Sequence, residues 1–313
     1  MKKLKLFIPC LALALTACND DSTPGADALG TALEVHTSIA HSRAMITDKS
    51  FAEGQSMGIT LVDNTADATS YDGKTQGYAN ICYTSKGTGD AQYWQSTTPI
   101  MLSSTEGKAV AYYPYSATAT DYTALPVKTD GQIDYMYSGW VSPVSNSNSS
   151  ANFSMKHALS AVRIMLTKGT YTGAGVWKDM RMTSYGFGTA GTLNAVTGRI
   201  SDVTVAEVNS YMMNPAWDRT TVLSTEHPTS MLVMVVPKDN VNDNVIMNFT
   251  IDDKTYQVKG LMTTPFMPGN IYTFRLTLDN QALVFDGQVS IEEWVEDTSA
   301  SADNDGKLTP AED

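Results

Sequence analysis

Cysteine, charge and long apolar runs are all scarce in this sequence. Of its three cysteines, Cys10 and Cys18 lie near the N-terminus, so Cys82 alone remains in the body of the 313 residues. A disulfide framework is therefore excluded for the folded part. Charged residues make up only 17% of the chain. Because 42% of the residues are apolar and many of them alternate with polar ones, wholesale disorder is excluded as well.

Acidic residues outnumber basic ones, and this excess of negative charge limits the kinds of partner that the protein can bind. The formal net charge is −12, from 21 basic and 33 acidic residues. Lys2, Lys3 and Lys5 lie in a leader, and without these three the 18 remaining bases give a net charge of −15. Such a field repels phosphate groups, so we expect no nucleic-acid partner.

The longest apolar run near the N-terminus has the features of a targeting segment. Residues 6–17 are about half the ~20 residues that a membrane-spanning helix requires, and the leader lysines come before them. This arrangement predicts a signal peptide over residues 1–17.

The end of this leader, Leu15-Thr16-Ala17-Cys18, resembles a bacterial lipobox. We expect cleavage before Cys18, whose thiol and new amine then carry acyl chains, palmitate among them. Several chains give a stable membrane anchor where one would not. Acidic residues 20–21 follow, as in surface-exposed lipoproteins, which indicates the outer face of the outer membrane.

The body of the chain has the pattern of short strands. Leu33, Val35, Thr37 and Ile39 alternate with polar residues, which is the period of a half-buried strand. Residues 157–166 fit either a strand or a short helix. Other segments rich in aromatic and β-branched residues are expected as strands: 57–62, 78–84, 110–113, 135–140, 231–236, 245–251, 256–258, 272–278 and 283–294.

Low-complexity segments suggest how the body is divided. The polar stretch at 143–152 is the best candidate boundary, and residues 295–313 form a polar, acidic tail. Short strands with frequent turns are typical of β-sandwiches. We therefore expect an all-β fold with one sandwich over residues 44–152 and a second over 153–294.

Two glycine motifs are better explained by loops than by catalysis. Gly54-x-Ser56-x-Gly58 matches a nucleophile elbow, but residues 59–61 continue as a strand where a hydrolase needs a helix. Residues 186–191 match G-x-G-x-x-G, and strand and turn residues follow where a dinucleotide site needs a helix. We expect no enzyme and no nucleotide cofactor.

The remaining chemistry-bearing residues give weak signals. The four histidines are scattered without metal-ligand spacing, so no metal site is expected. Cys82 has no cationic neighbour in sequence, which favours a buried apolar role over a nucleophile. Sandwich cores and interfaces use aromatic residues routinely, and a glycan platform is the alternative role for four tryptophans: Trp94, Trp140, Trp177 and Trp217.

The acidic tail holds a partial calcium-loop motif. Residues 301–312 carry Asp303, Asp305, Gly306 and Glu312 at the spacing of such a loop. Ser301 stands where the first aspartate belongs. A solvated tail is therefore favoured, and calcium binding is the alternative.

The lipobox and the order of several motifs together resemble the fimbrillin family, the subunits of type V pili and related surface lipoproteins. The motifs are Arg43 with Phe51, Gly54, Gly58 and Ile59; residues 78–81; residues 112–115; Phe153 with residues 157–159; residues 268–274; and Ile291-x-x-Trp294. The resemblance implies two tandem transthyretin-like sandwiches, a fimbrium or cell-surface location, and other fimbrillin subunits and a host or bacterial receptor as partners.

The same resemblance implies a mode of assembly. Residues 18–43 would act as a lipid tether and a removable strand carrying Leu33, Val35 and Ile39. A surface protease would cut the Arg43–Ala44 bond, and the C-terminal strand of the next subunit would fill the groove. An uncut Arg43 is the alternative at this bond.

The tail departs from the pattern of stalk subunits. Stalk fimbrillins carry an alternating apolar strand beyond the Ile-x-x-Trp position, whereas here residues 292–313 hold eight acidic residues and one lysine. This composition opposes burial in a neighbour. We therefore expect a tip or accessory subunit, and a glycan-binding surface lipoprotein is the alternative function.

Overall fold

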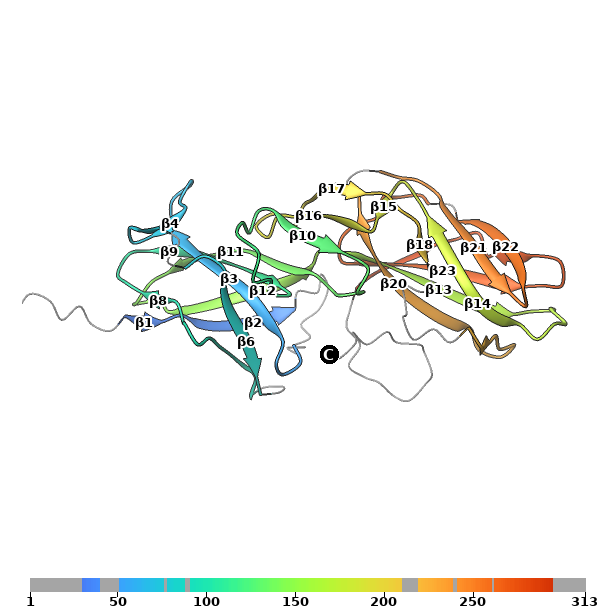
Figure 1. Cartoon of the computed structure of the whole chain (residues 1–313), viewed down its shortest axis with the longest axis horizontal. Helices are drawn as coiled ribbons and strands as arrows, with labels where there is room; N and C mark the ends of the chain where they lie inside the picture. The colour runs from blue at the N-terminus through green and yellow to red at the C-terminus, as the bar shows by residue number, and fades with distance from the viewer. Residues whose placement is uncertain are drawn as a thin grey trace, which may run out of the picture. The chain divides into compact units, whose positions relative to one another are not determined.

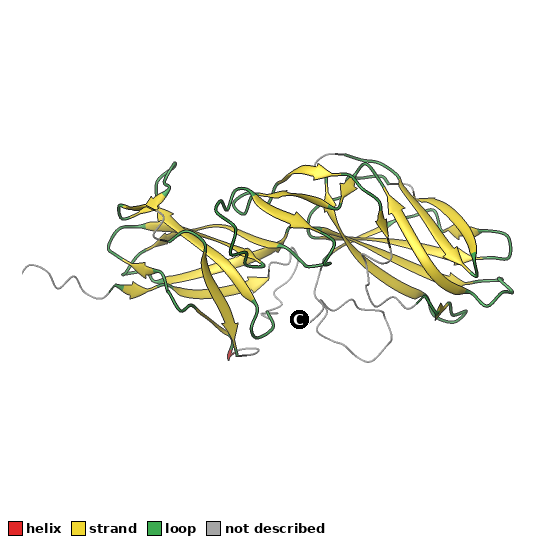
Figure 2. Ribbon diagram, viewed as in Figure 1, coloured by secondary structure: helices red, strands yellow, loops and turns green. Residues whose placement is uncertain are grey.

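The computed structural model describes residues 30–39, 51–75, 78–87, 91–209, 219–238, 241–260 and 262–294. These residues form strands joined by loops, and they contain no α-helix (Figure 2). The prediction of an all-β fold is confirmed. Within the same residues, no helix has the length and apolar character that a membrane span needs.

The N-terminal region, residues 31–157, is built on one sheet of seven strands in the order β2-β12-β11-β9-β3-β6-β7 (Figure 1). The strands are β2 (Glu34–Ile39), β3 (Ser56–Asp63), β6 (Ile81–Lys86), β7 (Tyr93–Gln95), β9 (Gly107–Tyr113), β11 (Met136–Val144) and β12 (Ser150–His157).

Residue pattern explains these strands. In β12 every second side chain is buried, among them Phe153 and Met155. In β3 nearly every side chain is buried, so both faces of this central strand are covered. Met57 and Ile59 of β3 lie in one core cluster with Phe153 and Met155 of β12. Burial of this face stabilises the sheet by about 25 cal/mol per Å² of apolar surface.

The C-terminal region, residues 160–294, contains two further sheets. One has the order β15-β20-β13-β23-β24, with β25 also on β23; the other has the order β18-β14-β21-β22, with β19 also on β14. The first set is β13 (Ser160–Lys168), β15 (Phe187–Gly188), β20 (Thr229–Pro237), β23 (Asn270–Leu278), β24 (Leu283–Phe285) and β25 (Ser290–Glu293). The second is β14 (Val176–Thr183), β18 (Val208–Asn209), β19 (Thr221–Val222), β21 (Val245–Ile251) and β22 (Lys254–Gly260).

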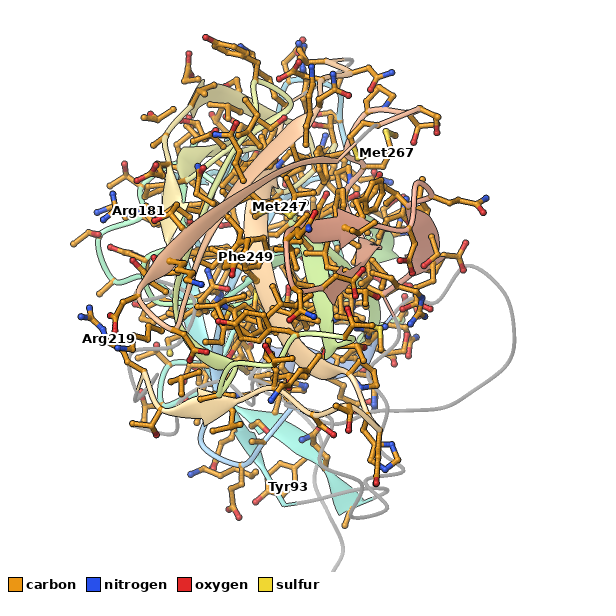
Figure 3. All side chains as sticks on the ribbon, turned by 90° about the vertical axis from the view of Figure 1, so that its right-hand side faces the viewer. Tyr93, Arg181, Arg219, Met247, Phe249 and Met267 are labelled. Carbon is orange, nitrogen blue, oxygen red and sulfur yellow. The ribbon has the colours of Figure 1, made fainter. Side chains whose placement is uncertain are left out.

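The core of the C-terminal region draws side chains from both of these sheets. Met247 and Phe249 of β21 and Phe274 of β23 are buried in one cluster. Figure 3 shows Met247 and Phe249 among other side chains, whereas Arg181 lies at the outside. Two sheets that share one apolar layer form a sandwich.

Smaller sheets complete the fold. A three-stranded sheet pairs β10 (Leu125–Lys128) with β16 (Ala190–Leu193) and β17 (Ile200–Thr204), so it contains strands from both regions. Two short pairs join β1 (Thr31–Ala32) to β8 (Met101–Leu102), and β4 (Ser70–Tyr71) to β5 (Lys74–Thr75).

Several strand expectations agree with the structure, and two details differ. Residues 157–166 contain the start of β13 and no helix, so the helical alternative is wrong. The strand expected at 78–84 begins only at Ile81, because Asn80 has a positive φ of 53° and its side chain donates hydrogen bonds to two loop carbonyls.

The polar stretch at 143–152 lies at the β11–β12 hairpin. Strands on both sides of it are hydrogen-bonded in the same sheet, since Met136 pairs with His157 and Tyr137 with Lys156. Serine and asparagine suit a hairpin turn as well as a linker, because both residues solvate the chain and tolerate turn conformations. The seven-stranded sheet therefore extends to His157, beyond the boundary expected at residue 152.

Candidate functional site

The N-terminal strand β2 lies at one edge of the seven-stranded sheet. It runs parallel to β12, with Val35 opposite Ala151 and Ile39 opposite Met155. Among the described strands, β12 is the only one that forms a ladder with β2. All other ladders of this sheet are antiparallel. β2 is therefore held in the sheet by one backbone ladder, as is the three-residue β7 at the other end of the strand order.

The residues just before β2 pair with a different part of the chain. β1 is antiparallel to β8, and the Leu33 N–H donates to the Ile100 carbonyl at 2.8 Å. The Glu34 N–H then donates to the Ser149 carbonyl at 2.9 Å, where pairing with β12 begins. Residues 31–39 therefore cross from one partner strand to another.

The inward face of this segment belongs to the core. Leu33, Val35 and Ile39 are between 5% and 7% exposed and lie in one cluster with Phe153 and Met155 of β12. On the outward face, the polar side chains at positions 34, 36 and 38 are exposed. Removing this segment would therefore open an apolar groove alongside β12, with unpaired backbone groups on the β12 edge.

The far side of the groove is formed by β7, which lies next to β2. One side-chain hydrogen bond crosses between them, from the Trp94 indole Nε1–H to the Thr37 Oγ1 at 3.0 Å. The Phe51 ring meets the Trp94 ring edge-on, with centroids 5.2 Å apart. Tyr83, which accepts from the Ile100 N–H at 3.0 Å, belongs to the same cluster, and burial raises the pKa of its hydroxyl.

The predicted site residues fall into two groups. Leu33, Val35 and Ile39 are brought together in the groove as the strand pattern indicated. Cys18, Arg43 and Ala44 lie outside the described residues, as does the 301–312 loop, so their roles stay predictions. The strand pattern included Thr37 and the tryptophan list included Trp94, but no sequence signal joined them, because their contact spans 57 positions.

The first glycine motif serves packing. A Cβ atom at Gly58 would lie 2.3 Å from the Tyr112 ring. Tyr112 donates to the Asn80 Oδ1 at 2.6 Å, and burial raises its pKa to about 12, so the hydroxyl stays neutral. Ser56 shares a 2.9 Å hydrogen bond with Thr84. Ser56 and Gly58 therefore lie in β3, whereas the sequence favoured a loop.

The second glycine motif also lies among strands. Gly188 is in β15 and Gly191 in β16, and a Cβ at Gly188 would lie 2.1 Å from the Thr204 carbonyl oxygen. Gly191 similarly lies against Ile200. Close strand packing accounts for both glycines.

One histidine is part of a buried polar contact. His157 Nδ1 lies 2.7 Å from the Asp134 Oδ2, and its ring stacks on Trp294 with centroids 4.7 Å apart. Among the described residues, no group of three or more His, Cys, Asp or Glu side chains is placed to hold a metal ion. Cys82 is a half-buried free thiol in β6.

The described tryptophans occupy the core or its margin. Trp94, Trp177 and Trp294 are at most 8% exposed. Trp140 is half-buried, with the Lys108 ammonium 4.7 Å from its ring. Trp217 lies outside the described residues. The described set therefore offers no broad indole surface on which a sugar could stack.

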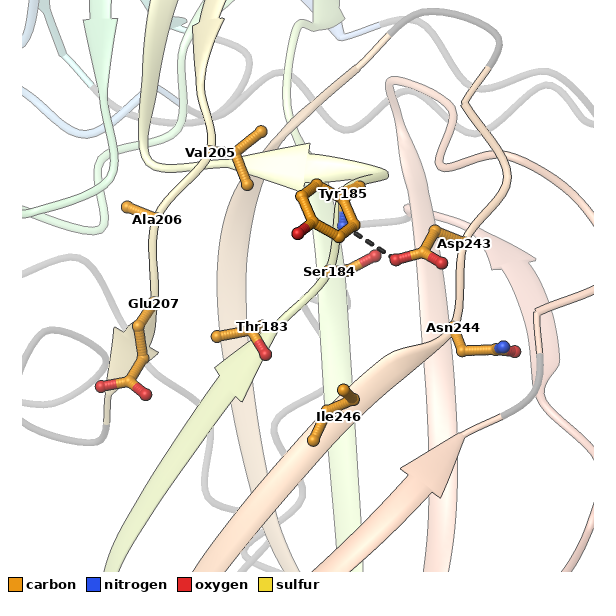
Figure 4. A pocket seen from close by; sticks show the side chains of 9 residues that line it. All are labelled: Thr183, Ser184, Tyr185, Val205, Ala206, Glu207, Asp243, Asn244 and Ile246. Carbon is orange, nitrogen blue, oxygen red and sulfur yellow. Dashed lines mark hydrogen bonds between the residues drawn. The ribbon is translucent and has the colours of Figure 1, made fainter.

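A different aromatic residue lines a surface pocket among the described residues. This pocket of about 380 Å³ lies in the C-terminal region and includes Tyr185, Val205, Asp243 and Ile246 (Figure 4). Tyr185 is 71% exposed. The Asp243 Oδ2 accepts from the Tyr185 N–H at 3.0 Å, which fixes the chain beneath the ring. An exposed ring beside a carboxylate can contact both the apolar and the hydroxyl groups of a ligand.

Comparison with known proteins identifies relatives of this fold. The family model described as Fimbrillin-like matches residues 42–294. No match to the chain is found among curated proteins.

Solved structures with the same fold come from species of Bacteroides. A candidate cell adhesion protein from Bacteroides uniformis is 21% identical at a TM-score of 0.63, covering 85% of this chain and 99% of its own. A similarly described protein from Bacteroides ovatus is 16% identical at 0.62, with 86% and 99% covered. A fimbrial protein from Bacteroides vulgatus is 12% identical at 0.53, with 84% and 99% covered.

Proposed function

The chain belongs to the fimbrillin-like family, and from this premise we propose that it is a non-enzymatic cell-surface protein that acts as a pilus subunit or adhesin. Its fold is shared with a fimbrial protein and with candidate cell adhesion proteins. The order of motifs that resembles fimbrillins in the sequence is thus confirmed at the level of the family. The subunit joins other fimbrillin subunits by strand exchange.

The edge position of β2 is the observation that carries strand exchange. One ladder joins β2 to the sheet, while its inward side chains fill the core. Cutting after Arg43 separates this strand from the rest of the chain. A vacated groove with an apolar floor and unpaired backbone groups binds an added strand by β-augmentation. The same cut releases the subunit from a lipid anchor on Cys18.

The place of the subunit in a pilus follows from the composition of its tail. Residues 295–313 contain few large apolar side chains and much acid, so this segment has little to insert into a neighbour's groove. A subunit that accepts a strand and donates none ends a filament. It therefore serves as a tip or accessory subunit, with the uncut form held at the outer membrane by its lipid.

The mature N-terminus on the cell surface tests this function. Surface-purified protein is expected to begin at Ala44, and Arg43→Ala is expected to leave the N-terminus acylated at Cys18. Arg43→Lys is the matched control for an arginine-specific protease. An N-terminus acylated in every wild-type molecule would refute processing. Filaments built from this chain alone, seen by electron microscopy, would refute the tip or accessory role.

A second candidate function is glycan binding, which the pocket at Tyr185 favours. A tyrosine ring that is 71% exposed beside the carboxylate of Asp243 suits the C–H and hydroxyl faces of a sugar. A glycan-array signal lost in Tyr185→Ala and kept in Tyr93→Ala would support it, since Tyr93 is 56% exposed outside the pocket. Absence of any array signal at millimolar glycan would exclude this pocket as a sugar site.

A further inference from the structure

One polar contact stands out in the otherwise apolar face of the N-terminal strand. Inward positions 33, 35 and 39 carry leucine, valine and isoleucine, but the inward position 37 carries threonine. Its Oγ1 accepts the hydrogen bond from the Trp94 Nε1–H at 3.0 Å. Since no backbone ladder joins β2 to β7 among the described residues, this bond links the two strands across the groove.

The Trp94 indole is part of the wall of the groove, and residues outside β2 hold it there. Trp94 pairs with Ser85 in the β6–β7 ladder, and the Phe51 ring packs edge-on against it. The side chain is only 8% exposed. The pairing with Ser85 and the contact with Phe51 do not involve β2, so both can hold the indole when another strand lies in the groove.

A buried N–H without an acceptor is costly, because the group has lost water and gained nothing. An aliphatic side chain in the place of Thr37 would leave the Trp94 N–H buried without an acceptor. A hydroxyl side chain there satisfies it, while aliphatic side chains two residues before and two residues after fill the places of Val35 and Ile39.

We propose that Trp94 is a specificity-determining residue of the groove, and that the groove selects a partner strand with the inward pattern aliphatic, hydroxyl, aliphatic. This inference rests on the proposed strand exchange and names the chemistry of the incoming strand. The strand replaces β2, so it runs parallel to β12. No position within residues 295–313 begins this pattern at a spacing of two, so this segment does not fit the groove.

Competition between peptides tests the selection in the folded full chain. The purified protein is cut after Arg43, so that the severed strand stays in the groove and can be exchanged. A labelled peptide of residues 30–40 is then displaced by unlabelled peptides of wild-type sequence, Thr37→Val or Thr37→Ser. Valine has nearly the shape of threonine without its hydroxyl, so this change isolates the hydrogen bond.

We expect the Thr37→Val peptide to compete about tenfold more weakly than the wild-type peptide, and the Thr37→Ser peptide to compete within about threefold. A Ser38→Ala peptide is the matched control, because it loses a hydroxyl on the exposed face and should compete like the wild type. With Trp94→Phe protein, which keeps the ring but lacks the N–H, the Thr37→Val penalty should disappear.

The possible failures are distinguishable. Equal competition by wild-type and Thr37→Val peptides on wild-type protein overturns the selection and leaves strand exchange standing. No uptake of any peptide by the cut protein overturns strand exchange, and this inference with it. A double-mutant cycle of Thr37→Val and Trp94→Phe in the uncut chain gives a second measurement. Additive effects on urea unfolding would overturn the coupling directly.

Discussion

The N-terminal and C-terminal regions each contain one pair of parallel strands, but they place it differently. In the N-terminal region the pair is β2–β12, with β2 at the sheet edge. In the C-terminal region the pair is β13–β23, in the middle of its sheet. The second edge of β23 is covered by β24 and β25, both antiparallel.

This difference bears on the strand exchange that we propose for β2. Removing β23 would break ladders on both of its edges and remove Phe274 from the core. Removing β2 breaks one ladder and one crossing side-chain bond. The local chemistry of the two strands is alike, since both alternate apolar and polar residues. Position in the sheet is therefore what makes β2, and not β23, the candidate for the proposed exchange.

The largest expected effect is regional loss of protection when the N-terminal strand is absent. In a chain that starts at Ala44, amides of β12 should exchange with solvent much faster, because the ladder with β2 is gone. Amides of β13 and β23 should keep their protection. Hydrogen exchange read by mass spectrometry measures both. Equal acceleration in the two regions would contradict the regional difference.

Core truncation is expected to give the next largest effect. Phe153→Ala and Phe274→Ala each remove a fully buried ring, so each should lower the free energy of unfolding by about 3–5 kcal/mol in the intact chain. Without the N-terminal strand, Phe153→Ala should cost less, because the groove already opens beside that ring. Urea denaturation measures both substitutions, each with and without the N-terminal strand. If Phe153→Ala lowers the free energy of unfolding equally in both chains, the groove is not open beside that ring.

A smaller, pH-dependent effect is expected in the C-terminal region alone. Burial by itself would raise the pKa of Asp252, but the backbone N–H groups of Gly175 and Val176, each at 2.8 Å, and the Tyr171 hydroxyl hold it below its ordinary value. A lowered pKa in the folded state stabilises the protein above the unfolded pKa of about 3.9. This contribution disappears as the pH falls through the folded pKa.

Asp252→Asn is therefore expected to cost about 1–2 kcal/mol at pH 7, and this difference from the wild type should vanish in strong acid. The cost should be the same with and without the N-terminal strand. Urea unfolding across a pH series measures both statements. A cost that changes when the strand is removed would show that the regions are energetically coupled at this turn.

The smallest expected effect comes from the exposed ion pair between Lys178 and Asp253, the residue next to Asp252. Lys178 donates to the Asp253 carboxylate at 2.8 Å, but Asp253 is 81% exposed in its side chain. Exposed pairs of this kind contribute little because water and salt screen them. Lys178→Ala should change the free energy of unfolding by less than about 0.5 kcal/mol. A larger change would mean that this exposed pair contributes as much as the contacts of the half-buried Asp252 carboxylate.

Local patterns in the sequence predicted most of the longer strands but few of the short ones. Residues 245–251 and 272–278 alternate cleanly and are β21 and most of β23. Two long strands were missed: β12, which begins inside the polar stretch at 143–152, and β14, in which Lys178, Asp179 and Arg181 interrupt the apolar residues. Residues 143–152 were interpreted as a domain boundary, because a polar hairpin turn and a linker have the same composition.

Sequence by itself determined that the chain is all-β and fimbrillin-like. The reason is that residue alternation is a local property of each segment, and the order of motifs can be read along the chain without knowing how the strands pair. Tertiary structure alone decided that β2 lies at an edge, parallel to β12, and that Trp94 meets Thr37 across the groove. The physical reason is that pairing between strands far apart in the chain depends on how all of them share the core. No single segment carries that information.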